Sequence, residues 1–133
     1  MRKIFIDENI SEHYCPAFNL FEKPDTKIEV RTTILDFGRG VQDKDLIEPI
    51  AKLDGILLTK DKDFKRMQLL IDLIKQHKLG VVFFRHPAKL SKWEEIAIFT
   101  KVWPQIRELA ILYHRPPYLQ EFTHNCKLKE LTL

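Results

Sequence analysis

The chain has little of what several common protein classes require. Its two cysteines, Cys15 and Cys126, show no C-x-x-C or Cys/His spacing, so neither a zinc site nor a disulfide framework is expected. No stretch approaches the roughly 20 apolar residues of a membrane span, since the longest apolar run covers only residues 79–84. The N-terminus lacks the apolar segment of a secretory signal. We therefore expect a cytoplasmic protein with two free thiols and no membrane contact.

An obvious covalent nucleophile is also missing. No serine, cysteine or histidine is placed beside a base in the manner that nucleophilic catalysis requires. The scattered histidines are interpreted as surface or boundary residues: His13, His77, His114 and His124. Internal repeats, low-complexity tracts and linkers are absent, and the length of 133 residues fits one domain, residues 1–133. Any chemistry must therefore come from another set of side chains.

Short apolar runs alternate with helical patterns along the chain. We predict strands at residues 3–6, 27–31, 55–59 and 79–84, and helices at residues 11–21, 43–53, 63–77 and 92–112. Two further short strands, or an edge hairpin, are expected at residues 118–123 and 127–131. Strands that alternate with helices predict a single α/β three-layer domain with a mostly parallel central sheet. The first and third strands lack polar alternation, which places the first inside the sheet and the third beside it.

Several turn and cap signals set the expected element boundaries. Pro16 is expected to break the first helix early, and Pro24 to end it. Gly38 and Gly40 are able to adopt positive φ in the loop at residues 36–40. Ser91, with a glutamate three residues later, forms a capping box that predicts the start of the last long helix.

Four aspartates are expected at one edge of this sheet. Asp7 and Asp61 follow the first and third strands, while Asp43 and Asp63 open helices. In an open α/β sheet, ligands bind outside the carboxyl ends of the strands. Four carboxylates at such short distances repel one another strongly unless a cation binds or some of them are protonated. The pattern therefore predicts a site for Mg²⁺ or Mn²⁺, which prefer oxygen ligands.

Three neighbouring side chains are expected to support this site. Asn9 is placed to orient Asp7 or a water, although it also suits a helix N-cap. Thr59, at the end of the third strand, is placed to bond a carboxylate or a phosphate. Glu8 lies directly beside Asp7, and Asp36 and Asp45 are weaker candidates.

Basic residues crowd around the second half of the acidic set. Acidic residues ringed by basic ones suit a metal-dependent site that acts on a polyanion, and Phe64 adds an apolar neighbour. A solvated, salt-bridged helix start explains the same cluster equally well. The nucleic-acid-binding set that we predict holds phosphates without reading bases, and consists of Lys60, Lys62, Lys65, Arg66, Arg85 and Arg39.

These motifs resemble those of the compact PIN-like domains over about residues 1–86. That group carries an Asp-Glu-Asn start, an aspartate at a helix opening and a Thr-x-Asp-x-Asp-Phe turn. The matching segments here are Ile6-Asp7-Glu8-Asn9, Asp43 with Leu46-Ile47 and Ala51 behind it, Ile56 to Phe64, and Gly80 to Arg85.

The resemblance implies a PIN fold, Mg²⁺ or Mn²⁺ dependence and ribonuclease activity. By position, the acidic quartet would be Asp7, Asp43, Asp61 and Asp63. It also implies RNA as substrate, and an antitoxin protein as partner if the chain is the toxin of a toxin–antitoxin pair. A homodimer is a further open expectation.

Two other functions stay open at this point. A phosphoacceptor receiver domain also places acids after strands one and three, but it needs a lysine after a fifth strand, and none is evident. A non-catalytic PIN-like module that binds RNA through its basic residues is the second alternative. We expect instead hydrolysis of single-stranded RNA by a metal-activated water, without a covalent intermediate.

Overall fold

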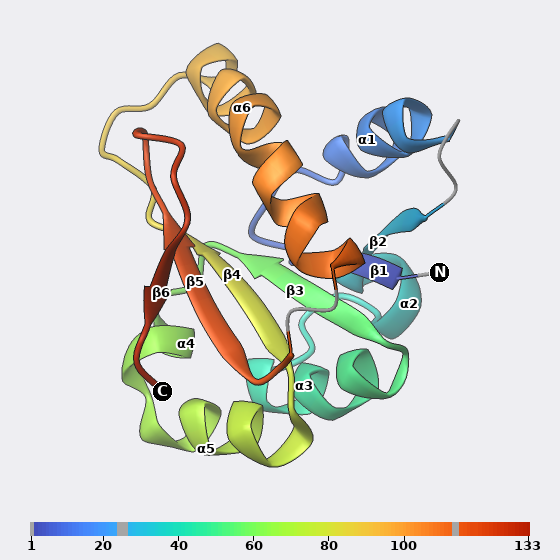
Figure 1. Ribbon diagram of the computed structural model, residues 1–133, viewed down its shortest axis with the longest axis vertical. Helices are drawn as coiled ribbons and strands as arrows, with labels where there is room; N and C mark the ends of the chain where they lie inside the picture. Colours follow the sequence, from blue (N-terminus) through green and yellow to red (C-terminus); the bar gives the residue numbers. More distant parts are fainter. Residues whose placement is uncertain (1, 24–26, 113–114) are drawn as a thin grey trace.

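The computed structural model describes residues 2–23, 27–112 and 115–133. Six strands and six helices make up this part of the chain (Figure 1). In chain order they are β1 Arg2–Ile6, α1 Tyr14–Glu22, β2 Ile28–Thr32, α2 Thr33–Phe37, α3 Asp43–Lys52, β3 Gly55–Thr59, α4 Asp63–Arg66, α5 Gln68–His77, β4 Gly80–Phe84, α6 Lys92–Ile111, β5 Tyr118–Phe122 and β6 Lys129–Leu131.

The strands form one sheet in the order β2-β1-β3-β4-β5-β6. All neighbouring pairs are parallel except β5 and β6, which are antiparallel. The predicted α/β class, the mostly parallel sheet and the position of β1 inside it next to β3 are therefore confirmed. The expected hairpin is also present, as β5 and β6.

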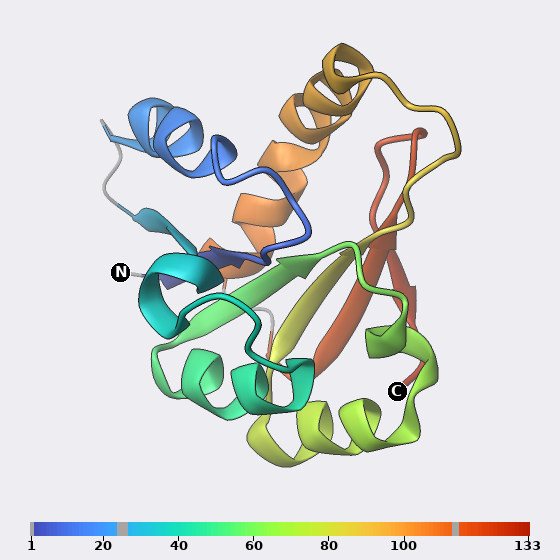
Figure 2. The same cartoon turned by 180° about the vertical axis from the view of Figure 1, so that it is seen from behind.

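Helices cover both faces of the sheet, with α1 and α6 on one face and α3, α4 and α5 on the other (Figures 1 and 2). Because side chains alternate along a strand, each buried strand supplies both cores. Ile4 and Leu58 pack toward α1 and α6, whereas Phe5 and Leu57 pack toward α3 and α5. This two-sided burial explains why β1 and β3 are apolar without alternation.

Most element boundaries shift by one or two residues, and three larger differences from the expected elements stand out. Residues 63–77 form two helices, because Met67 adopts an extended conformation (φ −87°, ψ 116°) that ends α4 and begins α5. The break lets Phe64 and Leu70 both enter the core. Within residues 32–37, Thr32 caps the unpredicted helix α2 by accepting a hydrogen bond from the Leu35 amide at 3.1 Å.

The first helix begins at Tyr14 rather than at residue 11. Pro16 does not break it, because a proline in the first turn removes only an amide that has no partner inside the helix. Pro24 lies outside the described residues. Gly38 and Gly40 do have positive φ, at 93° and 74°, and the Ser91 capping box opens α6 as expected.

None of the helices in the described ranges combines the length and apolarity needed to cross a membrane.

Candidate metal centre and adjoining basic pocket

Three of the four predicted aspartates gather at the carboxyl edge of the sheet. Asp43, Asp61 and Asp63 each offer a carboxylate oxygen, and these oxygens all lie within 4.8 Å of one another. The loops after β1 and β3 leave the sheet at this same edge (Figure 2). Oxygen atoms at this spacing can share one divalent cation, since carboxylates are ligands of choice for hard ions.

The local chain explains why two of these side chains meet. The Asp61 carboxylate accepts a hydrogen bond from the backbone amide of Asp63 at 2.9 Å. That bond folds residues 61–63 into a tight turn at the start of α4, which keeps both carboxylates on one side. Asp43 reaches them from the first residue of α3.

Asp7 lies beside this group but outside it. Its carboxylate is buried and accepts hydrogen bonds from the Thr59 hydroxyl at 2.7 Å and from the Glu8 amide at 2.8 Å. The Thr59 hydroxyl oxygen in turn accepts a hydrogen bond from the Asp61 amide at 3.0 Å. One threonine therefore joins the end of β1 to the acidic turn that follows β3.

The electrostatics of the site favour protonation of Asp7 and Asp43 when no cation is bound. Burial raises the pKa of the Asp7 carboxyl above its ordinary value, and repulsion from Asp61 adds to that effect. The pKa of Asp43 rises to about 8, first because of burial and then because of the hydrogen bond and repulsion with Asp61. Repulsion from Asp7 contributes to the same shift, so Asp7 interacts electrostatically with Asp43. A bound cation would relieve the repulsion.

The expected supporting residues hold loops rather than reach the carboxylate group. Asn9 accepts a hydrogen bond from the Lys60 amide at 3.3 Å and so ties the turn after β1 to the turn after β3. Glu8 accepts from the Gly40 amide at 3.2 Å, which fastens the loop that precedes α3. Asp45 is exposed on α3, and Asp36 pairs with Arg31. Thr59 contacts an aspartate of the predicted quartet through its side chain, and Glu8 contacts Asp7 through its backbone amide.

Four of the six predicted basic residues line one pocket of about 250 Å³ next to the acidic turn. They are Lys60, Lys62, Lys65 and Arg85, and Phe83 and His86 complete the lining. The other two predicted basic residues do not line this pocket and lie near other carboxylates. Arg66 pairs with Asp63 at 3.3 Å, and Arg39 faces Glu12 at 3.9 Å. Phe64 is fully buried under the sheet, so the aromatic residue of the basic pocket is Phe83 instead.

Sequence reasoning missed two carboxylates that hold this basic pocket. Glu95 of α6 accepts hydrogen bonds from Lys60 at 3.1 Å and from the Tyr14 hydroxyl at 3.1 Å. It also lies 3.0 Å from the His86 ring. Burial alone raises the pKa of Glu95, but the hydrogen bonds from its partners, Lys60 first, outweigh burial and hold that pKa below its ordinary value. Glu121 of β5 pairs with Lys65 at 2.9 Å and approaches Arg85 at 4.0 Å.

The fold and the acidic cluster together define an α/β protein with carboxylates gathered at the carboxyl edge of a mostly parallel sheet. A family model described as a PIN like domain matches residues 2–86, and the chain belongs to that family. No curated protein and no solved structure matches the chain. The family match ends before α6, so Glu95 and Glu121 lie outside it. PIN-like membership also favours a nuclease fold over the receiver-domain alternative.

Proposed function

We propose that this protein is a Mg²⁺- or Mn²⁺-dependent endoribonuclease that hydrolyses phosphodiester bonds in single-stranded RNA. The observation that carries the proposal is the group of carboxylate oxygens from Asp43, Asp61 and Asp63 within 4.8 Å of one another. Three such charges repel strongly, and a hard divalent cation is the partner that oxygen donors favour. Family membership supports hydrolysis, because PIN-like domains are commonly nucleases.

The residues present fit such a cation. Asp43, Asp61 and Asp63 would hold it, and Asp7 lies beside them with its carboxylate fixed by Thr59. When bound, a divalent cation lowers the pKa of a water and offsets the charge that develops on a phosphoryl oxygen. The chain contributes orientation, because the hydrogen bonds to Asp7 and Asp61 align both carboxylates before any ligand arrives.

The substrate part of the proposal rests on charge. The basic pocket adjoins the acidic turn, which places cations for phosphates next to the carboxylates. Contacts to phosphates position a nucleic acid but carry no base information, so we expect little sequence preference.

We also propose that the protein acts in the cytoplasm as the toxin of a toxin–antitoxin pair. The support is the resemblance of the Asp-Glu-Asn start and the Thr-x-Asp-x-Asp-Phe turn to compact PIN-like toxins. The expected partners are an antitoxin protein and a second copy of the chain. Induced expression should then arrest growth, and co-expression of a neighbouring gene product should restore it.

Calorimetric titration of Mn²⁺ and a cleavage assay on single-stranded RNA test the metal centre. Asp7→Asn and Asp61→Asn should each lose Mn²⁺ affinity and cleavage while circular dichroism shows an intact fold. Asp45→Asn is the matched control, because it removes the same charge from an exposed position on α3 outside the carboxylate group.

Excess EDTA should abolish cleavage by the unaltered protein. Equal cleavage in EDTA, or full activity of Asp7→Asn, would contradict the mechanism and favour a non-catalytic RNA-binding module. If Asp45→Asn loses Mn²⁺ as strongly as Asp61→Asn, the metal is not held by the proposed residues.

A further inference from the structure

We propose that the basic pocket is a discrete subsite for one phosphate group of the RNA, separate from the metal centre. The substrate class in this inference rests on the proposed ribonuclease function. A subsite of this kind differs from a general basic rim, because it holds a single phosphate at a fixed place relative to the scissile bond. It would make cleavage depend on where the RNA carries that phosphate.

The pocket has the size and lining that a phosphate with its sugar requires. Its volume is about 250 Å³, below the ~300–1,000 Å³ typical of sites for drug-sized ligands. Phe83 cannot serve as a stacking platform, because it is buried and the Lys65 ammonium lies 5.2 Å from its ring centroid. The His86 ring, the other aromatic group of the lining, lies 3.0 Å from Glu95. The lining therefore offers mainly charge and hydrogen-bond donors, which favours phosphate over a base.

Charge in the pocket stays positive after its internal ion pairs are counted. Lys60, Lys62, Lys65 and Arg85 supply four positive charges, and the carboxylates of Glu95 and Glu121 return two negative ones. The difference is two positive charges, without any contribution from His86. This positive balance suits a negatively charged phosphate group. Among the described residues Lys62 makes no ion pair, so no carboxylate competes with a phosphate for its ammonium group.

The two carboxylates also fix the donors in place. Glu95 holds Lys60 at 3.1 Å, and Glu121 holds Lys65 at 2.9 Å. Flexible lysine side chains lose rotamer freedom when they bind a ligand, and donors that are already fixed lose less. Glu95 and Glu121 are themselves mostly buried, with side chains 13% and 11% exposed, so Lys60 and Lys65 are held by carboxylates with little freedom to move.

One turn separates this pocket from the metal centre. Along residues 60–65, Asp61 and Asp63 join the carboxylate group, whereas Lys60, Lys62 and Lys65 line the basic pocket. A second pocket, of about 160 Å³, is lined on the acidic side by Asp43 and Asp63 among others. A phosphate in the basic pocket is thus next to the carboxylates but not among them.

The phosphate can come from two sources, an RNA end or the internal backbone. We would measure binding in EDTA, where cleavage is blocked, with short fluorescent oligouridylates that carry either a 5′-phosphate or a 5′-hydroxyl. The variant is Lys62→Ala with Arg85→Gln. Both residues are exposed, and Glu121 keeps its partner Lys65, so we expect the fold to be preserved. The matched control is Lys75→Ala with Lys101→Ala, which removes two exposed lysines from α5 and α6.

The salt dependence distinguishes one phosphate from several. For single strands the slope of log K against log salt is about −0.7 for each phosphate neutralised. Because both cations serve one phosphate, the variant should bind about tenfold more weakly and flatten the slope by about 0.7. Two independent rim contacts would instead flatten it by about 1.4 and would overturn the subsite. The control should change neither quantity.

The group at the 5′ end of the oligouridylate then identifies which phosphate of the RNA the pocket binds. A preference for the 5′-phosphate that disappears in the variant identifies a terminal phosphate, and equal binding of both ends with the same slope change identifies an internal one. Unchanged affinity in the variant would rule the pocket out. Since no metal is present, a protein that passes this test and fails to cleave with Mn²⁺ loses the nuclease proposal but keeps the subsite.

Discussion

At the scale of single residues, Thr59 connects the parts of the candidate metal centre. It is fully buried at the end of β3, donates to Asp7 and accepts from the Asp61 amide. Partners of metal-binding carboxylates fix the direction in which the lone pairs point. The sequence was enough to predict that the aspartates lie at one edge of the sheet. The double role of the Thr59 hydroxyl was not predictable in the same way, because it depends on the register of β1 against β3.

Replacing Thr59 with valine keeps the shape and removes both hydrogen bonds. We expect Thr59→Val to lower the free energy of unfolding by about 1–3 kcal/mol, because a buried carboxylate and an amide lose a partner. Mn²⁺ affinity should fall about 10- to 100-fold, as for other supporting residues of metal sites. Urea unfolding and Mn²⁺ titration measure the two effects. Thr100→Val, at an exposed position on α6, is the control and should change neither.

The raised pKa of Asp43 predicts how stability depends on pH without metal. Its pKa is about 8 in the folded chain against an ordinary 3.8, so the folded state binds more protons between these values. Stability must therefore fall as pH rises through this window and level off above it. Asp7, whose pKa is also raised, acts in the same direction.

Thermal unfolding in EDTA from pH 5 to 8.5 checks this dependence. The melting temperature should fall with pH in the unaltered protein and fall less in Asp43→Asn. Saturating Mg²⁺ or Mn²⁺ should flatten the curve, because it binds the charged carboxylates. Glu95 has a lowered pKa and loses its contribution only in more acid solution. A melting temperature that rises across the window in EDTA would contradict the electrostatic account.

At the scale of elements, α1 is fastened to α6 over one face of the sheet. The rings of Phe18 and Trp103 stack with centroids 4.1 Å apart. Beside them, the buried Glu22 carboxylate accepts hydrogen bonds from the Trp103 indole at 2.9 Å and from Arg107 at 2.6 and 2.9 Å. This contact sits away from the acidic turn, so it offers a way to alter stability alone.

Glu22→Gln should weaken the contact while preserving its shape. A neutral amide cannot satisfy the paired Arg107 donors, so the free energy of unfolding should drop by about 2 kcal/mol. Mn²⁺ affinity should stay unchanged. Urea unfolding gives the first quantity, with Glu108→Gln, at an exposed position on α6, as the control. Equal stability of both variants would show that the Glu22 contact contributes nothing.

The elements show which structural features are visible in a sequence. Apolar runs and the Ser91 cap predicted β1, β3, β4 and the start of α6, because local patterns govern them. The break at Met67 was not predicted, since burial of Phe64 and Leu70 in one core decides it. Glu95 lies 35 residues from Lys60 in the chain, so no local motif could reveal their contact.

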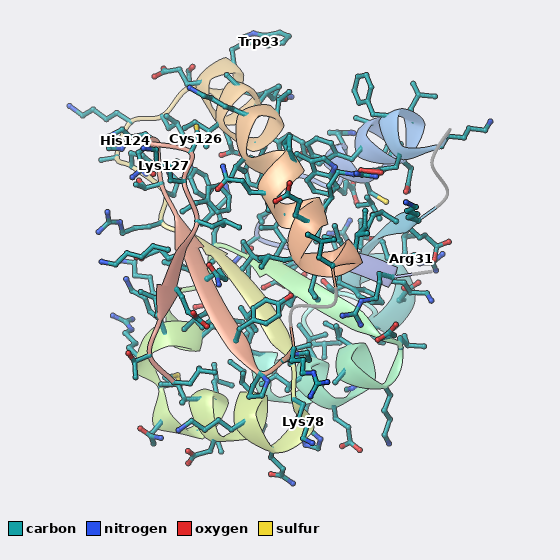
Figure 3. The ribbon with its side chains drawn as sticks, in the orientation of Figure 1. Arg31, Lys78, Trp93, His124, Cys126 and Lys127 are labelled. Atoms are coloured by element: carbon teal, nitrogen blue, oxygen red, sulfur yellow. The ribbon has the colours of Figure 1, made fainter. Side chains whose placement is uncertain are left out.

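Exposed apolar side chains were equally hard to predict. Leu20 and Phe21 near the end of α1 are 69% and 78% exposed. Trp93 projects outward from the first turn of α6 and is 79% exposed (Figure 3).

At the scale of the whole molecule, the family match covers only part of the sheet. Residues 2–86 contain β1 to β4, whereas α6, β5 and β6 follow the match. Phe99, Val102 and Ile106 of α6 are fully buried against the sheet, and β5 pairs with β4 along all five of its residues. The later segment also supplies Glu95 and Glu121 to the basic pocket. We propose that residues 1–133 fold as one unit.

Truncation after residue 86 tests this proposal. The shortened chain would expose the apolar face that α6 covers, including Ile4, Leu58 and Phe84, and would leave β4 as an unpaired edge. Exposed apolar surface and open strand edges favour aggregation over folding. We expect the truncated chain to lack a cooperative thermal transition and to show poorly dispersed amide signals by NMR, whereas the full chain unfolds cooperatively. A well-dispersed spectrum and a sharp transition for residues 1–86 would mean that the matched segment is an independent domain, and that α6, β5 and β6 are an attachment to it.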